Sequence, residues 1–297
     1  MNGMVLEGGA MRGLFTAGVL DALFADDVRF DGIIGVSAGA CFGCNYKSHQ
    51  PGRAIRYNKR FARDPRYCSL GSLIKTGDLF NAEFCYHTLP ERLDAFDKRT
   101  FASDPTRFYC VTTDCKTGDP VYHLCEKADT ETFEWIRASA SMPVVSRPVP
   151  LAGSWHLDGG LSDGIPLRYF ETLGYDRNLV ITTRPQGYRK FPSWKRLLVY
   201  PFLQRWPTVR KTIAMRPARY NATLDYIERR AAAGAALVFA PEEPLPISRT
   251  CHNPEQMQHV YDIGLCIGRR RLAEVRKFFA TNRGTISPQG SQPTSQA

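Results

Sequence analysis

The stretch Gly35-Val36-Ser37-Ala38-Gly39 decides the fold of this chain. It follows an apolar run at 31–36 that is rich in branched side chains, and it precedes a segment at 38–48 whose small residues are typical of a closely packed helix. Ser37 is therefore expected on a sharp strand-to-helix turn, where glycine two residues before and after it lets the hydroxyl point outward. We interpret the stretch as a nucleophile elbow, although the motif alone is weak in a chain with 24 glycines.

A glycine-rich turn, Glu7-Gly8-Gly9-Ala10-Met11-Arg12-Gly13, precedes the elbow by one strand. A dinucleotide fingerprint would need glycine where Ala10 stands, and a phosphate loop would need Gly-Lys-Ser or Gly-Lys-Thr, which the turn lacks. Consecutive amides at a helix N-terminus can instead bind a developing alkoxide. The oxyanion-hole interpretation explains why an exposed serine follows one strand later.

Composition bounds the class of protein. With 297 residues, 43% of them hydrophobic, we expect one large α/β domain over 1–280, mostly helical from 190 to 280. No apolar run reaches the roughly 18 residues of a membrane span, and the start lacks the features of an export signal, so we expect a cytoplasmic protein. Residues 281–297 are rich in Ser, Gln, Pro and Gly, which predicts a disordered tail.

The cysteines are nine in number and scattered, which indicates reduced thiols. The pair in Cys41-Phe42-Gly43-Cys44 leaves a redox site or a zinc half-site open, but no second ligand pair follows it.

The order of elements begins with strand, glycine turn, helix 14–24, strand and elbow, which is a βαβ unit. Residues 68–80 are expected to be a loop, and 107–113 and 120–124 a hairpin. Strands are expected at 178–183 and 236–240, and further helices at about 218–233 and 254–279.

A serine nucleophile needs a base. Only one strand precedes Ser37, whereas an α/β-hydrolase has several before its elbow. The six histidines occur in no recognisable catalytic setting, and His156, His252 and His259 remain candidates for a Ser-His-Asp alternative. Asp158, in Asp158-Gly159-Gly160, follows a short strand at a turn where its carboxylate can approach another loop; such a triplet is more often only a turn.

Together these motifs resemble the patatin-like phospholipase family, over about residues 4–279. The glycine turn (Gly8, Gly9, Ala10, Met11, Arg12, Gly13) resembles the oxyanion loop of that family. The segment Gly35–Gly39 resembles its nucleophile elbow, and Asp158-Gly159-Gly160 resembles its base motif. The segment Arg137-Ala138-Ser139-Ala140-Ser141-Met142-Pro143 also resembles the family. The resemblance implies a three-layer α/β/α sandwich with a largely parallel sheet.

The resemblance also implies an activity. It identifies Ser37 as nucleophile and Asp158 as general base of a hydrolase that cleaves phospholipid or related esters, with the oxyanion held by amides around Gly9 and Ala10. It implies no cofactor and no metal. Ala10 departs from the glycine that the family usually has, and if it needs positive φ its Cβ costs about 1 kcal/mol. A catalytically weak or inactive lipid-binding protein of the same fold is the alternative.

The net charge of +10 has one concentration, at 188–219. Peripheral contact with an anionic membrane is one interpretation, and a solvated helix face with its aromatic rings in the core is the other; no nucleic acid is expected. The stretch combines these cations and aromatic residues: Tyr188, Arg189, Lys190, Phe191, Trp194, Lys195, Arg196, Tyr200, Phe202, Arg205, Trp206, Arg210, Lys211, Arg216 and Arg219.

Overall fold

The first two strands form the centre of the sheet. β1 (Asn2–Leu6) and β2 (Gly32–Val36) pair in parallel, and α1 (Gly13–Ala25) connects them. Both strands are almost entirely buried, as expected of parallel strands that have helices on both faces. This computed structural model describes residues 1–194 and 196–280. The expected tail at 281–297 lies outside the described residues.

Within residues 1–194 and 196–280, the sheet has eight strands and is open. The pairs β1–β2, β1–β7, β2–β3 and β7–β8 are parallel, and the pairs β3–β4, β3–β6 and β5–β6 are antiparallel. The order along the sheet is β5 (Val149–Leu151), β6 (Ser154–Asp158), β3 (Arg107–Asp114), β2, β1, β7 (Arg177–Ile181) and β8 (Ala236–Phe239), with β4 (Pro120–Cys125) pairing with β3 outside this path.

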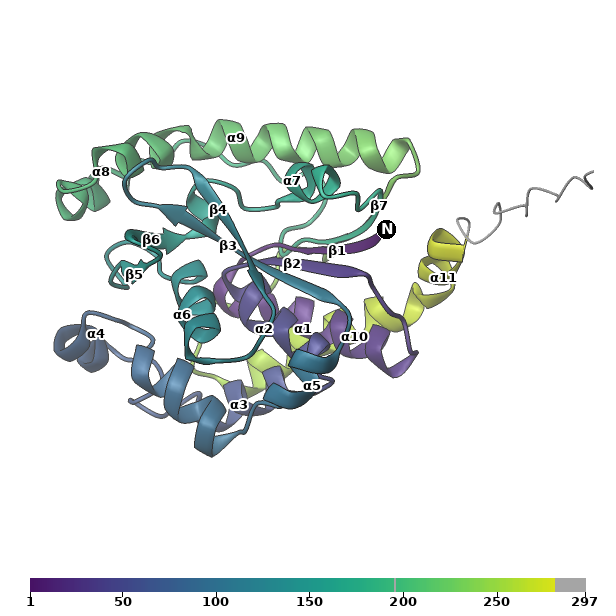
Figure 1. Ribbon diagram of the computed structural model, residues 1–297, viewed down its shortest axis with the longest axis horizontal. Coiled ribbons are helices and arrows are strands. Elements are labelled where there is room, and N and C mark those ends of the chain that lie inside the picture. The colour runs from purple at the N-terminus through teal and green to yellow at the C-terminus, as the bar shows by residue number, and fades with distance from the viewer. Residues whose placement is uncertain (195, 281–297) are drawn as a thin grey trace, which may run out of the picture.

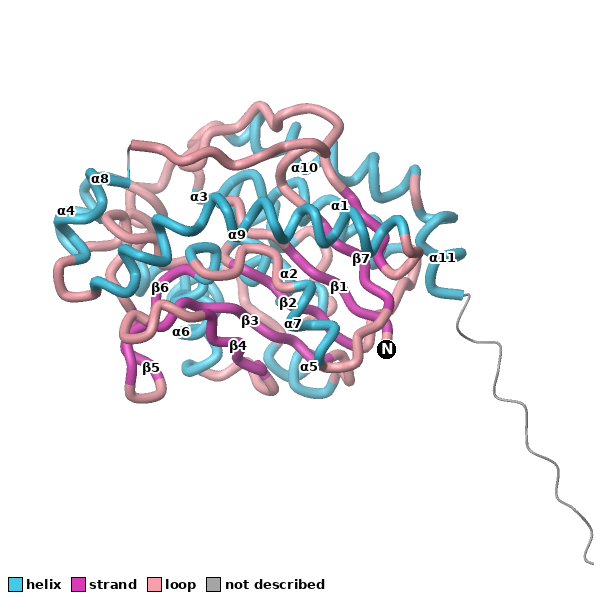
Figure 2. Tube along the Cα trace, turned by 90° about the horizontal axis from the view of Figure 1, so that it is seen from above, coloured by secondary structure: helices cyan, strands magenta, loops and turns pink. Residues whose placement is uncertain are grey.

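Helices cover both faces, so the predicted three-layer sandwich is confirmed (Figure 1). Figure 2 shows α9 and α7 running over the sheet on one side. That layer consists of α7 (Leu167–Thr172) and α9 (Pro207–Ala232), whereas the other contains α1, α2 (Ala38–Lys47), α3 (Arg53–Phe61), α6 (Thr130–Ser139) and α10 (Pro254–Arg270).

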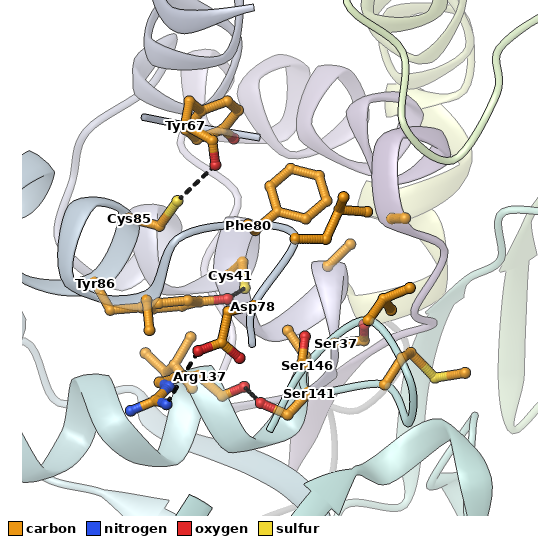
Figure 3. Close-up of a pocket in the computed structure, with 18 of the residues that line it drawn as sticks. Ser37, Cys41, Tyr67, Asp78, Phe80, Cys85, Tyr86, Arg137, Ser141 and Ser146 are labelled. Carbon is orange, nitrogen blue, oxygen red and sulfur yellow. Dashed lines mark hydrogen bonds and ion pairs between the residues drawn. The ribbon is translucent and has the colours of Figure 1, made fainter. Parts of the chain in front are cut away.

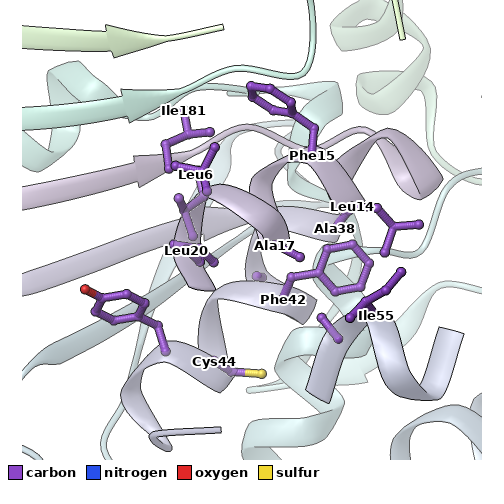
Figure 4. Packing of buried hydrophobic residues seen from close by; sticks show 14 of the residues in the cluster. Leu6, Leu14, Phe15, Ala17, Leu20, Ala38, Phe42, Cys44, Ile55 and Ile181 are labelled. Carbon is purple, nitrogen blue, oxygen red and sulfur yellow. The ribbon is translucent and has the colours of Figure 1, made fainter. Parts of the chain in front are cut away.

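The larger hydrophobic core lies between the sheet and the layer of α1, α2 and α10. Leu6, Phe15 and Phe42 pack together there (Figure 4). α1 and α10 approach closely, because a β-carbon added to Gly18 would lie 2.0 Å from a carbonyl oxygen of α10, and one added to Gly264 would lie 2.0 Å from a carbonyl oxygen of α1. Larger side chains there would separate the two helices.

Three expectations from the sequence were wrong. The expected loop at 68–80 contains α4 (Leu70–Thr76), capped by the Ser69 side chain. The helix expected from about 218 begins at Pro207, because proline is well accommodated in the first turn of a helix. The expected final helix is divided at Arg271 into α10 and α11 (Leu272–Ala280). The remaining described elements are α5 (Lys98–Ser103), α8 (Arg196–Val199), the 3₁₀ helices at 10–12, 159–161 and 200–203, and a π-helix at 84–93.

Candidate active site

Ser37 occupies the sharp turn that the sequence predicts between β2 and α2. Its backbone has φ 54° and ψ −122°, a strained conformation for a residue with a side chain. A β-carbon on Gly35 would lie 2.6 Å from the nitrogen of Ala40, and one on Gly39 would lie 2.4 Å from the carbonyl oxygen of Leu6. Both flanking glycines are therefore required by close backbone approach.

The glycine-rich loop lies directly against Ser37. A β-carbon on Gly8 would lie 2.9 Å from Ser37 Cβ, and one on Gly9 would lie 2.6 Å from Thr183 Oγ1. Ala10 has φ 51°, in the left-handed region that a β-carbon disfavours. Among the described residues, the N–H groups of Gly9 and Ala10 have no hydrogen-bond acceptor. Two donors are thus free beside the serine.

The remaining residues of the loop fix its position. Met11 is buried and lines the same cavity as Ser37. Gly13 allows α1 to begin close to α2, because a β-carbon there would lie 2.8 Å from Ala38 Cβ. Burial and the neighbouring charge of Arg184 lower the pKa of Arg12 to about 10.

Glu7, at the start of the loop, fixes the position of the loop through hydrogen bonds. This buried carboxylate accepts hydrogen bonds from the Thr183 nitrogen at 2.6 Å and from the Tyr220 hydroxyl at 2.6 Å. Thr183 Oγ1 in turn donates to the carbonyl oxygen of Gly8 at 3.0 Å. The loop is therefore tied to the end of β7 and to α9.

Sheet register brings Asp158 to Ser37. Val36 at the end of β2 pairs with Val111 of β3, and the next β3 residue, Thr112, pairs with Asp158 at the end of β6. A β-carbon on Gly159 would lie 2.2 Å from the Val111 carbonyl oxygen, so the turn after Asp158 packs closely on β3. The two residues are 121 positions apart in the sequence, and the sheet places them at one edge.

Ser139 links the same strand ends. Its hydroxyl is fully buried, accepts a hydrogen bond from the Ser37 nitrogen at 2.9 Å and donates one to the Val111 carbonyl oxygen at 2.6 Å. The last turn of α6 thus holds the elbow in place. The sequence contained this serine in a family-like segment but gave no sign of its contact.

The Asp158 carboxyl group is 2% exposed and accepts a hydrogen bond from the Gly160 nitrogen at 2.7 Å. Burial raises its pKa above the usual range. A side-chain hydrogen bond with Ser37 and the positive charges of Arg216 and Arg249 act in the opposite direction. The arrangement suits a carboxylate that accepts a proton from Ser37.

A cavity of about 530 Å³ begins at Ser37 and has mainly apolar walls (Figure 3). Its size lies within the roughly 300–1,000 Å³ of small-molecule sites. Phe80, Phe96 and Phe133 contribute to the walls. Two of the charged residues in its walls, Asp78 and Arg137, form an ion pair at 3.6 Å. Such a cavity accommodates an apolar chain attached to a group at Ser37.

The histidine alternative has no support in the geometry. No histidine among the described residues lines this cavity. The buried His156 bonds through Nδ1 to Thr112 Oγ1 at 3.0 Å, and burial lowers its pKa. His252 bonds to the carbonyl oxygen of Ala62 at 2.7 Å.

The cysteine alternative is equally unsupported. Burial raises the pKa of both Cys41 and Cys44 to about 12, so neither thiol is readily ionised. In the described part of the chain, no group of three or more His, Cys, Asp and Glu side chains is arranged to hold a metal ion.

The basic aromatic stretch at 188–219 is divided between core and surface. Tyr188 and Trp206 pack against buried residues, whereas Phe191, Trp194 and Phe202 are 77%, 68% and 64% exposed. The interpretation that places all its aromatic rings in the core is therefore wrong. Lys195 lies outside the described residues.

This stretch also borders the cavity. Leu198 and Val199 of α8 line it together with Ser37, although Leu198 is 60% exposed. None of the helices that the structure describes is both long and apolar enough to cross a membrane.

Comparison with known proteins agrees with this geometry. The model of the patatin-like phospholipase family matches residues 4–171, which include Ser37 and Asp158, and a domain of unknown function, DUF6363, matches residues 206–280. An Escherichia coli protein, "Uncharacterized protein YjjU", is 29% identical over 92% of this chain and 78% of its own length.

Lysophospholipases of fungi are also similar. "Lysophospholipase nte1" of Emericella nidulans is 27% identical over 92% of this chain, and "Lysophospholipase NTE1" of Chaetomium globosum is 25% identical over 98%. The chain spans only 18% and 19% of their lengths. The solved structure of VipD from Legionella pneumophila matches 92% of this chain and 67% of that chain, with 12% identity and a TM-score of 0.45. With more than half of its residues matched by one family model, the chain belongs to the patatin-like phospholipase family.

Proposed function

We propose that this protein is a serine acyl hydrolase that cleaves ester bonds of phospholipids or related lipids through Ser37 and Asp158. Family membership and the lysophospholipase relatives support a lipid hydrolase. The observation that carries the finer proposal is a buried carboxylate at the nucleophile elbow, beside a loop whose Gly9 and Ala10 amides have no acceptor in the part of the chain that the structure describes. The apolar cavity that begins at Ser37 agrees with a lipid acyl chain.

The mechanism follows from these contacts. Asp158 accepts the Ser37 hydroxyl proton while Ser37 Oγ attacks the ester carbonyl carbon, and the N–H groups of Gly9 and Ala10 hold the resulting oxyanion. The tetrahedral intermediate expels the alcohol, which takes the proton from Asp158. Water then loses a proton to Asp158 and attacks the acyl-enzyme carbonyl carbon. The second tetrahedral intermediate releases the fatty acid as Ser37 Oγ leaves and takes the proton back from Asp158.

Exposed apolar side chains of the stretch that borders the cavity support contact with a lipid surface. Phe191, Trp194 and Leu198 belong to the 188–219 stretch, and Leu198 itself lines the cavity. Aromatic and leucine side chains next to cations favour the interface of an anionic bilayer. The enzyme thus binds peripherally through this stretch and draws an acyl chain into the cavity.

The test replaces the two proposed catalytic residues. Ser37→Ala and Asp158→Asn should each lower hydrolysis of a short-chain ester by about 10³-fold or more, and the double variant should be little worse, because the two act as one unit. Ser146→Ala is the matched control, since Ser146 lines the same cavity. A fluorophosphonate should label the wild type and the control but not Ser37→Ala.

Two outcomes would contradict the proposal. Activity retained in Asp158→Asn but lost in His156→Ala would indicate a histidine-based site. A folded wild type that binds lipid yet neither turns over esters nor reacts with the fluorophosphonate would indicate the inactive lipid-binding alternative.

A further inference from the structure

Positively charged side chains gather on the side of Ser37 and Asp158 that faces α9. We propose that Arg216, Arg249 and Lys190 form an anion subsite beside Ser37, which binds the phosphate of a glycerophospholipid or lysophospholipid while its acyl chain occupies the cavity. This inference rests on the proposed hydrolase function. The three residues come from α9, from the loop before α10 and from the loop after β7.

Arg216 is the innermost of these cations. A β-carbon added to Gly160 would lie 3.5 Å from Arg216 Nη2, which places the guanidinium against the turn that carries Asp158. Its Nε atom is buried and has no hydrogen-bond partner among the described residues. The Nε atom of Arg12 is likewise buried and unpartnered. Buried guanidinium groups normally have acceptors, so both arginines lack a hydrogen bond that is expected of them.

Arg249 extends the cluster to the cavity, and Lys190 lies over the ring of Tyr220. Lys190 Nζ lies 3.7 Å from the centre of the Tyr220 ring, whose hydroxyl bonds to Glu7. Arg249 lines the cavity together with Ser37, and its charge acts on both Asp158 and Arg216. Burial, and then the charge of Arg216, lower the pKa of Lys190 to about 7. The cations therefore repel one another in the free protein.

The two carboxylates nearby, Glu7 and Asp158, offset this positive charge only in part. Glu7 accepts hydrogen bonds from Thr183 and Tyr220, and Asp158 faces Ser37 and Gly160. Five basic side chains lie near these two acids, and their charges act on one another: Arg12, Arg184, Lys190, Arg216 and Arg249. No salt bridge joins any of the five to an acid in the described part of the chain. An anionic ligand would supply the missing charge.

The position of the cluster selects the kind of anion. The apolar cavity takes the acyl chain and Ser37 takes the ester carbonyl, so the anion belongs to the part of the substrate beyond the ester. In a glycerophospholipid the glycerol separates the ester from the phosphate by only a few atoms. A phosphate oxyanion also matches guanidinium donors well.

The experiment compares two substrates with the same acyl chain, 1-decanoyl-lysophosphatidylcholine and 1-decanoylglycerol, both below the concentration at which they aggregate. Arg249→Gln should lower the ratio of kcat/KM for the phosphate substrate to that for the glyceride about tenfold, as expected for loss of a charge-assisted hydrogen bond. Arg249→Lys, which keeps the charge, should recover most of the ratio. Arg229→Gln, an exposed charge loss on α9 outside the 188–219 stretch, should leave the ratio as in the wild type.

A second measurement uses pH. Lys190 is charged below its pKa of about 7, so the same substrate ratio should fall as pH rises from 6 to 8.5, and Lys190→Gln should flatten this dependence. Titration of Asp158 affects both substrates and cancels in the ratio. The other groups that act on Lys190 are Arg216, Glu7, Arg249 and Arg12.

The outcomes separate this proposal from the function on which it rests. If Ser37→Ala keeps its activity, the hydrolase proposal itself fails. If Ser37→Ala is inactive but Arg249→Gln keeps the wild-type ratio, only the subsite is wrong. A third outcome has two parts: inorganic phosphate inhibits the wild type competitively but not Arg249→Gln, and the substrate ratio is the same in both proteins. This result would indicate a site for free phosphate and would overturn the assignment to a lipid phosphate.

Discussion

Ala10→Gly tests whether the oxyanion loop carries backbone strain. Ala10 has φ 51°, and a left-handed conformation costs a residue with a β-carbon about 1–2 kcal/mol. Glycine removes that cost, but it also raises the conformational entropy of the unfolded chain, which lowers the free energy of unfolding by about 0.4–1 kcal/mol. The net gain should be about 0.5–1 kcal/mol. For a domain of this size, that corresponds to a rise in Tm of about 1–3 °C.

Two matched variants make the measurement specific. Ala152 has φ 48° in the turn between β5 and β6, so Ala152→Gly should raise Tm by a similar amount. Ala222 is an exposed residue inside α9, and Ala222→Gly should lower stability by about 1 kcal/mol, since glycine is a poor helix former. Thermal unfolding followed by circular dichroism gives all three values.

Activity distinguishes the two strained alanines. Ala10→Gly should keep or raise kcat/KM for a short-chain ester, because the Gly9 and Ala10 amides gain freedom to align with the oxyanion, whereas Ala152→Gly should leave it unchanged. A loss of Tm in Ala10→Gly comparable to that of Ala222→Gly would refute the strain argument. A loss of activity would refute the loop's assigned role.

Two further predictions concern the base and the surface. Asp158 works as a base only when ionised, so kcat/KM should fall as pH decreases through its raised pKa. Arg249→Gln removes a positive charge that lowers this pKa, so the variant should have the acid limb of its pH profile at higher pH. An acid limb that does not move would contradict the assignment of Asp158 as the base. Phe191→Ser with Trp194→Ser should reduce co-sedimentation with phosphatidylglycerol vesicles, binding that also weakens with salt, while hydrolysis of a soluble ester persists. Equal losses on soluble and vesicular substrates would show that these side chains only support the fold.

Local patterns in the sequence predict the centre of the fold well. The β1–loop–α1–β2 unit and the elbow involve residues close in sequence, whose glycines are required by backbone contacts as near as 2.4 Å at Gly39. Positive φ at Ala10 was raised from the sequence only as a condition, and the structure has φ 51° there. These features are encoded within a few residues of where they act.

Helix boundaries at the surface were harder to predict. α4 has little contact with the core, and its Leu70 and Ile74 are 72% and 85% exposed, so apolar periodicity gives no reliable signal. Ser69, whose side chain accepts a hydrogen bond from the Ser72 nitrogen, was the available sign of a helix start. In α9, Pro217 lies inside the helix. The ten residues before it were not predicted as helical, because proline usually ends a helix.

The cation cluster could not be predicted because it depends on distant segments. Arg216 and Lys190 were visible only as part of a basic stretch, and nothing local relates Arg216 to Gly160, 56 residues earlier. The contacts of Ser139 and Glu7 were missed for the same reason, since their partners are far away in the sequence. Contacts of this kind follow from sheet register and from the path of α9 over the sheet.

The anion subsite and the catalytic base are coupled by charge. In the free protein, Arg216 and Arg249 lower the pKa of Asp158, which keeps it ionised but makes it a weaker base than burial alone would. A phosphate bound to these cations offsets their positive charge, so the pKa of Asp158 rises when a phosphate substrate is present. Asp158 is then a stronger acceptor for the Ser37 proton in the complex than in the free enzyme. On this reasoning the subsite contributes to turnover as well as to binding, and Arg249→Gln should change kcat as well as KM for the phosphate substrate.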